Sequence, residues 1–167
     1  MTESTIVKPF IISRVFNAPV ETVWQAWTDP DHMGWWGPKG VTIELPRLDL
    51  RPGGLFHYCM KTPDGHAMWG RWVIREVTPP ERLVFVNSFS DEAAGITRHP
   101  MNPAWPGEVL STITFATQTG RTLLTIRWEP LNPTEEERTA FDGGHESMQG
   151  GWSGSLDRLE EHLKGKS

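Results

Sequence analysis

The chain has 167 residues, with 16 Lys or Arg against 21 Asp or Glu, so its formal net charge is −5 at pH 7. This length predicts one domain, 1–167, with 1–7 as a flexible N-terminal tail. The acidic balance argues against a nucleic-acid partner, because nucleic-acid-binding proteins carry a basic surface. A single cysteine, Cys59, excludes an internal disulfide and a multi-cysteine metal site.

The hydropathy pattern excludes two further classes of protein. The longest apolar run, Leu83 to Val86, is far shorter than the roughly 20 residues of a membrane-spanning helix. Met1 to Pro9 lacks the basic and apolar regions of a signal peptide. We therefore expect a cytoplasmic location. Nine Trp against one Tyr are compatible with an aromatic-lined pocket and equally with an ordinary core.

The N-terminal part of the chain predicts a strand followed by two short helices. Residues 8–16 are rich in β-branched and aromatic side chains, which favours a strand. Pro19 suits the first position of a helix that ends at Asp29. Residues 32–40 predict a turn or second small helix. The pair Trp35-Trp36 fits a plug at one end of the fold, which we favour, or a contact in a homodimer, which stays open.

From residue 41 the apolar period changes to two, which predicts a series of strands. We expect these strands at 41–50, 54–62, 66–78, 82–90, 108–118 and 121–130. Short turns containing Gly and Pro separate most of them, as is typical of a meandering antiparallel sheet. The connection 91–107 is longer than most connections in a compact domain, and such loops are usually functional or disordered.

A long helix is predicted over 134–164. Thr134 and Glu137 form a capping-box pattern at its start. An apolar stripe at helical spacing follows, made of Phe141, His145, Met148, Trp152, Leu156, Leu159 and Leu163. Glycine costs about 1 kcal/mol relative to Ala inside a helix. Gly143-Gly144 therefore predicts a break in the helix, and the glycines within 150–154 predict close packing on the sheet or on a ligand.

Four stretches, in this order, resemble the helix-grip superfamily of START-related lipid-transfer domains, birch-pollen allergens and aromatic polyketide cyclases. They are Phe16-Asn-Ala-Pro-Val-Glu-Thr-Val-Trp24, Trp35-Trp-Gly-Pro-Lys39, the turns Arg51-Pro-Gly-Gly54, Pro63-Asp-Gly65 and Pro79-Pro-Glu-Arg-Leu83, and Gly151-Trp-Ser-Gly-Ser-Leu-Asp-Arg-Leu159. The likeness is strongest to the branch named after the C-terminal domain of the activator of the heat-shock-ninety ATPase. It implies an α+β helix-grip fold, in which a curved seven-stranded antiparallel sheet wraps around a long C-terminal helix, with two short helices after the first strand.

The resemblance also implies a cavity between the sheet and the last helix. Strand alternation and the helical stripe suggest which side chains bind a ligand there, although the face of Trp72 is left open by the adjacent Val73. The candidates are Trp24, His57, Trp72, Phe85, Asn87, Ser111, Phe115, Phe141, His145, Met148 and Trp152. Ligand pockets are mostly apolar with a few polar groups, and His57, Asn87, Ser111 and His145 are the candidates for those groups.

His145 is the one candidate for a catalytic role. It fits a neutral core histidine bonded to a backbone carbonyl, or an acid/base group in the cavity. We favour the core interpretation, because catalysis also requires a partner that the sequence does not place. Neither H-E-x-x-H nor G-x-S-x-G occurs. We expect no metal site and no cofactor.

The sequence thus predicts a module that binds a small hydrophobic or aromatic molecule of unspecified identity. One alternative is a co-chaperone-like protein-interaction domain. A second is an enzyme of the polyketide cyclase or dehydratase type that uses His145. The co-chaperone activity is not carried over from the resemblance. In the eukaryotic activator this domain works beside a separate chaperone-binding domain, and we expect no room for one in this sequence. Fold alone does not fix function.

Overall fold

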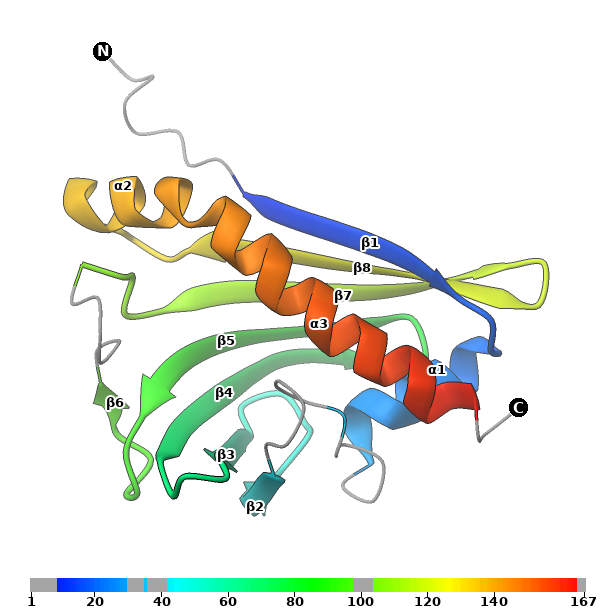
Figure 1. Cartoon of the computed structure of the whole chain (residues 1–167), viewed down its shortest axis with the longest axis horizontal. Helices are drawn as coiled ribbons and strands as arrows, with labels where there is room; N and C mark the ends of the chain where they lie inside the picture. The colour runs from blue at the N-terminus through cyan, green and yellow to red at the C-terminus, as the bar shows by residue number, and fades with distance from the viewer. Residues whose placement is uncertain (1–8, 30–34, 36–41, 98–103, 165–167) are drawn as a thin grey trace.

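The computed structural model describes residues 9–29, 35, 42–97 and 104–164. In these residues one antiparallel sheet of eight strands curves around a long C-terminal helix (Figure 1). The elements are β1 Phe10–Phe16, α1 Val20–Thr28, β2 Thr42–Leu48, β3 Leu55–Lys61, β4 Ala67–Thr78, β5 Arg82–Ser90, β6 Ile96–Thr97, β7 Val109–Gln118, β8 Arg121–Pro130, α2 Glu135–Gly143 and α3 His145–Lys164.

The sheet order is β1-β8-β7-β5-β4-β3-β2, and β6 pairs only with β5. This confirms the predicted α+β fold and each predicted strand to within a few residues. The predicted count of seven is corrected to eight, because the connection 91–107 contains the two-residue strand β6. The expected second short helix at 32–40 lies outside the described residues except for Trp35, and the expected tail 1–7 lies outside them entirely.

The packed core lies where α1 and the second half of α3 meet the sheet. Trp27 is fully buried there and stacks on Trp152, with ring centroids 6.0 Å apart. The indole Nε1 of Trp35 donates to the backbone oxygen of Ala26 at 2.9 Å, and its ring packs edge-on against Trp27. Trp35 therefore fills an internal position, as the plug interpretation predicts. Trp36 lies outside the described residues.

The predicted long helix is two helices. Thr134 accepts a hydrogen bond from the backbone of Glu137 at 3.0 Å in a complete capping box, and α2 ends at Gly143. The break falls at Gly144, where an added Cβ would lie 2.8 Å from Cζ3 of Trp105. None of the described helices is long and apolar enough to cross a membrane.

The predicted close packing of the glycines of 150–154 on the sheet is wrong, and their close approach to a ligand stays a prediction. A Cβ added at Gly150, Gly151 or Gly154 would have no heavy atom within 4 Å among the described residues. These glycines instead leave space on α3. The one close approach in this region is that of Trp105 to Gly144.

Candidate ligand-binding cavity

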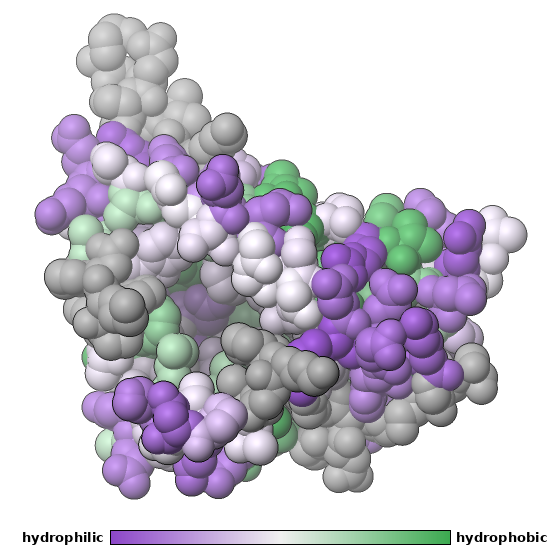
Figure 2. All heavy atoms as spheres, in the orientation of Figure 1, coloured by the Kyte–Doolittle hydropathy of each residue, from purple (hydrophilic) through white to green (hydrophobic). Residues whose placement is uncertain are grey.

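A cavity lies between the first half of α3 and strands β3, β4 and β5. Figure 2 shows this side of the molecule hollowed below the junction of α2 and α3. Two adjoining lobes have volumes of about 510 Å³ and 400 Å³, within the range of small-molecule pockets. Six residues line both lobes and form what we call the neck: Tyr58, Met60, Met68, Asn87, Trp128 and Met148.

Each lobe has its own walls beyond the neck. The junction lobe lies under the break between the helices and is bordered by Trp105, Gly144 and Ser147. The tryptophan lobe lies under the middle of α3 and is bordered by Trp72, Phe85, Trp152 and others. Trp72 stacks on Phe85 with ring centroids 3.7 Å apart and an angle of 15° between the planes. Stacked rings resist rotation in a packed wall, so this wall exists before any ligand arrives.

The described lining of both lobes contains no Asp, Glu, Lys, Arg or His. Its polar groups are hydroxyls, indole N–H groups and the carboxamide of Asn87. Nor do the described residues contain a group of three or more His, Cys, Asp or Glu that could hold a metal ion. Such a surface can enclose apolar and aromatic matter and offer it a few hydrogen bonds. It has no ionisable acid or base of ordinary strength for proton transfer.

Tyr58 is the titratable group of the neck, and the cavity wall strongly disfavours its ionisation. Burial raises the pKa of its hydroxyl to about 12, against the smaller opposing effect of a hydrogen bond with Trp72. Tyr58 lies directly opposite Gly70 in the β3–β4 register. A Cβ at Gly70 would collide with the Tyr58 ring, so glycine at this position lets the ring lie flat across β4.

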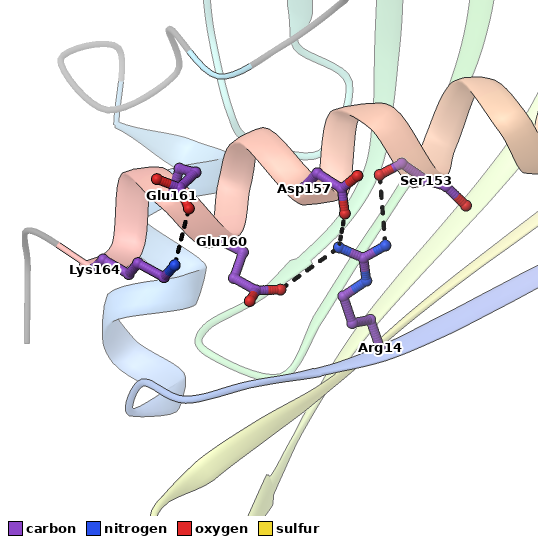
Figure 3. A network of polar contacts seen from close by, with 6 residues as sticks. All are labelled: Arg14, Ser153, Asp157, Glu160, Glu161 and Lys164. Carbon is purple, nitrogen blue, oxygen red and sulfur yellow. Dashed lines mark hydrogen bonds and ion pairs between the residues drawn. The ribbon is translucent and has the colours of Figure 1, made fainter.

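Helix α3 is anchored to β1 by polar contacts of Arg14 (Figure 3). The guanidinium of Arg14 on β1 donates to Asp157 at 2.7 Å, lies 3.7 Å from Glu160 and bonds the backbone oxygen of Ser153 at 3.5 Å. Near the start of α3, His145 packs edge-on against Phe10 of β1 with ring centroids 5.8 Å apart. The helix thus rests on β1 at one end of the sheet, while β3, β4 and β5 toward the other end form much of the cavity wall.

The comparisons with known proteins agree with this architecture. Residues 17–164 match the family described as activator of Hsp90 ATPase homolog 1-like protein. The chain belongs to this family. Protein Ms6760 from Mycobacterium smegmatis is 28% identical, with a TM-score of 0.74 over 95% of each chain. A protein from Arthrobacter aurescens is 26% identical, with a TM-score of 0.75 over 93% of this chain and 86% of that one.

A third structure, the AHSA1 protein from Silicibacter pomeroyi, is 18% identical and shares the fold, with a TM-score of 0.73 over 96% of this chain and 100% of that one. Among curated proteins, no sequence matches this chain. Membership of the family of activator-like proteins establishes the helix-grip fold with its kind of internal cavity. It assigns no ligand.

Five of the candidate site residues line the cavity. They are Trp72, Phe85, Asn87, Met148 and Trp152. The structure also settles the face of Trp72, which points inward while its neighbour Val73 does not line either lobe. That these five bind a ligand stays a prediction.

The other candidates lie elsewhere, and their expected place on the cavity wall is corrected. Trp24 and Phe115 pack edge-on against each other in the core near α1, with centroids 5.2 Å apart. Phe141 is fully buried beside His145 and Trp105. His145 itself is held between Phe141 and Phe10. Ser111 is fully buried beneath Asn87.

His57 lies on the opposite face of the sheet from the cavity. Its Nε2 is 2.9 Å from the backbone oxygen of Asp91, and its ring stacks on Trp69. Its register partner is Arg71. Successive residues of a strand point to opposite faces, so Tyr58 faces the cavity and His57 does not. His57 was predicted as a candidate because of the chemistry of its imidazole. The alternating residues Phe56, Tyr58 and Met60 indicate the inward face of β3, and His57 is not among them.

Sequence reasoning also missed Trp128, Met68 and Trp105. Alternation along 121–130 places Trp128 on the same face as Ile126, so that signal was available. Met68 occupies the matching face of β4, half exposed at the cavity. Trp105 precedes β7 in an irregular segment, where no periodicity indicates the direction of a side chain.

Proposed function

We propose that this protein binds an uncharged, apolar or aromatic small molecule in the two-lobed cavity. The observation that supports this proposal is the lining: aromatic rings and methionines, without a charged side chain among the described residues. Transfer of apolar surface from water into such a site stabilises a complex by about 25 cal/mol per Å². A charged ligand would lose its hydration without gaining a counter-charge.

The enzyme alternative relies on His145 as its one candidate catalytic group. His145 packs between Phe10 and Phe141 and does not line the cavity. No observation in the structure favours the protein-interaction alternative over binding of a small molecule.

A matched pair of fluorescent probes tests the charge preference. N-phenyl-1-naphthylamine is uncharged, and 8-anilinonaphthalene-1-sulfonate is the same ring system with a sulfonate. We expect saturable one-to-one binding of the uncharged probe and at least about tenfold weaker binding of the sulfonate, because a buried unpaired charge is costly. Equal affinities, or no saturable binding of the uncharged probe, would refute the proposal.

A pair of glycine variants places the probe in the cavity. Gly151 lines the tryptophan lobe and Gly150 does not, yet a Cβ at either position meets open space. Both Gly151→Leu and Gly150→Leu should raise helix stability by roughly 1 kcal/mol. Only Gly151→Leu places a side chain in the lobe, so it should abolish probe binding while the thermal midpoint rises. Loss of binding in both variants, or in neither, would remove the cavity as the site.

A further inference from the structure

We propose that Asn87, at the neck, selects ligands that carry a hydroxyl group on their apolar or aromatic body. This inference rests on the proposed function and adds the chemical class of the ligand. Of the six residues that line both lobes, three carry a polar group in the side chain: Tyr58, Asn87 and Trp128. A ligand that spans both lobes passes all three.

Asn87 offers the cavity a fixed hydrogen-bond acceptor. Its Nδ2 donates to Oγ of Ser111 at 3.1 Å, and Ser111 is fully buried. This bond ties the amino end of the carboxamide to the sheet. The other end, Oδ1, has no hydrogen-bond partner among the described residues and belongs to a side chain that borders both lobes. An acceptor that is enclosed by a ligand requires a donor from that ligand.

Trp128 borders the same part of the neck with its ring, while its indole N–H is covered by protein. Ser111 lies directly opposite Trp128 in the β7–β8 register, so the bond from Asn87 ends beside the tryptophan. The indole Nε1 of Trp128 is buried without a hydrogen-bond partner among the described residues. Trp27 shares that property, but it lies in the packed core and lines neither lobe.

The acceptor at the neck defines the complementary group, which must be a hydrogen-bond donor. A hydroxyl can donate its proton to Asn87 Oδ1. A methyl ether can only accept, and a methyl group can do neither. A carboxylate can only accept, and the described lining gives it no cation.

Three naphthalenes of closely similar shape test this preference: 2-naphthol, 2-methoxynaphthalene and 2-methylnaphthalene. Their affinities for the purified protein can be measured by quenching of Trp fluorescence and by calorimetry. We expect 2-naphthol to bind roughly fivefold to tenfold more tightly than 2-methylnaphthalene, the gain of about one net hydrogen bond. The methyl ether should resemble the methyl compound, because it cannot donate to Oδ1.

Variants at the neck identify the groups responsible. Asn87→Leu keeps the size of the side chain and removes the acceptor, so the preference should fall to about twofold or less while 2-methylnaphthalene binds at least as well. Ser111→Ala, which frees the carboxamide, should reduce the preference in part, as expected for a positioning residue. Trp128→Phe keeps a ring at the neck and leaves Oδ1 in place, so it serves as the control in which the preference for 2-naphthol persists.

The outcomes separate this inference from the proposed function. Retained binding of 2-methylnaphthalene in each variant shows that the fold and the cavity are intact. A preference for 2-naphthol that survives Asn87→Leu overturns the inference, and so does tight binding of all three compounds without preference; either result leaves the proposed function standing. Failure of all three to bind the unmodified protein overturns both.

Discussion

The two halves of α3 face the same sheet but pack against it differently. The second half buries Leu156, Leu159 and Leu163 against the sheet and α1. The first half presents Gly151 and other small residues, and the tryptophan lobe lies beneath it. Aromatic rings cover the sheet on both sides of this boundary. The difference therefore comes from the helix, where leucines fill the interior and small residues leave it open.

Deletion of one large side chain in each half gives the largest effect and the most direct test of this contrast. Leu159→Ala should lower the free energy of unfolding by about 2–5 kcal/mol, because a new void opens in a packed core. Met148→Ala should cost about half as much or less, because the space it vacates joins an existing cavity. Chemical denaturation of both variants measures the difference. Equal losses would show that the first half of α3 is packed as tightly as the second.

The junction between the helices should respond to a single methyl group. Gly144→Ala places a Cβ against Trp105, so we expect a loss of about 1–3 kcal/mol from overpacking. Gly143→Ala meets open space and serves as the matched control, with no loss of stability expected. If Gly144→Ala is as stable as Gly143→Ala in thermal unfolding, Trp105 moves freely and does not form a fixed wall of the junction lobe.

Titration of Tyr58 reports on the environment of the cavity neck. Burial raises the pKa of the Tyr58 hydroxyl from 10.0 to about 12. As the pH rises, the unfolded chain therefore loses this proton at a lower pH than the folded protein does. Its contribution to stability is thus present below pH 10 and is lost as the pH rises through about 12.

Because the chain has one Tyr, phenolate absorbance reports Tyr58 alone. We expect a midpoint near 12 in the folded protein and near 10 in denaturant. In Tyr58→Phe the absorbance change should vanish, and the pH dependence of unfolding between these values should flatten. A midpoint near 10 in the folded protein would mean that water fills the neck.

The anchor of α3 on β1 should give the smallest effect. The Asp157 side chain is 73% exposed and that of Arg14 is 25% exposed, and ion pairs open to solvent contribute about 0–1 kcal/mol. Asp157→Ala should therefore lower the free energy of unfolding by less than about 1 kcal/mol, and less still at high salt. A larger loss of unfolding free energy that does not depend on salt would indicate that polar contacts, and not the leucines, hold the second half of α3 on the sheet.

Much of the fold could be predicted from the sequence, because its signals are local. Alternation located the strands, the capping box at Thr134 located α2, and Gly143-Gly144 located the break between the helices. Strand β6 has too few residues to show an alternating apolar pattern. The space beside Gly151 could not be predicted, because glycine occurs both where elements pack closely and where space is left open. The lining of the cavity was predicted less well. Which apolar residues fill the core and which border a hollow depends on the opposing layer, which a strand's own sequence does not contain.

The pairing of β1 with β8 has a consequence for how the chain is made. Phe10 lies opposite Trp128, so the first strand finds its only described partner near the far end of the sequence. During synthesis, β1 and α1 leave the ribosome early. The curved sheet can be completed only after β8 and α3 have been synthesised. Such non-local pairing is slow relative to the hairpins in between. The cavity is therefore among the last features to form, and a nascent or truncated chain would present its aromatic wall to any hydrophobic surface nearby.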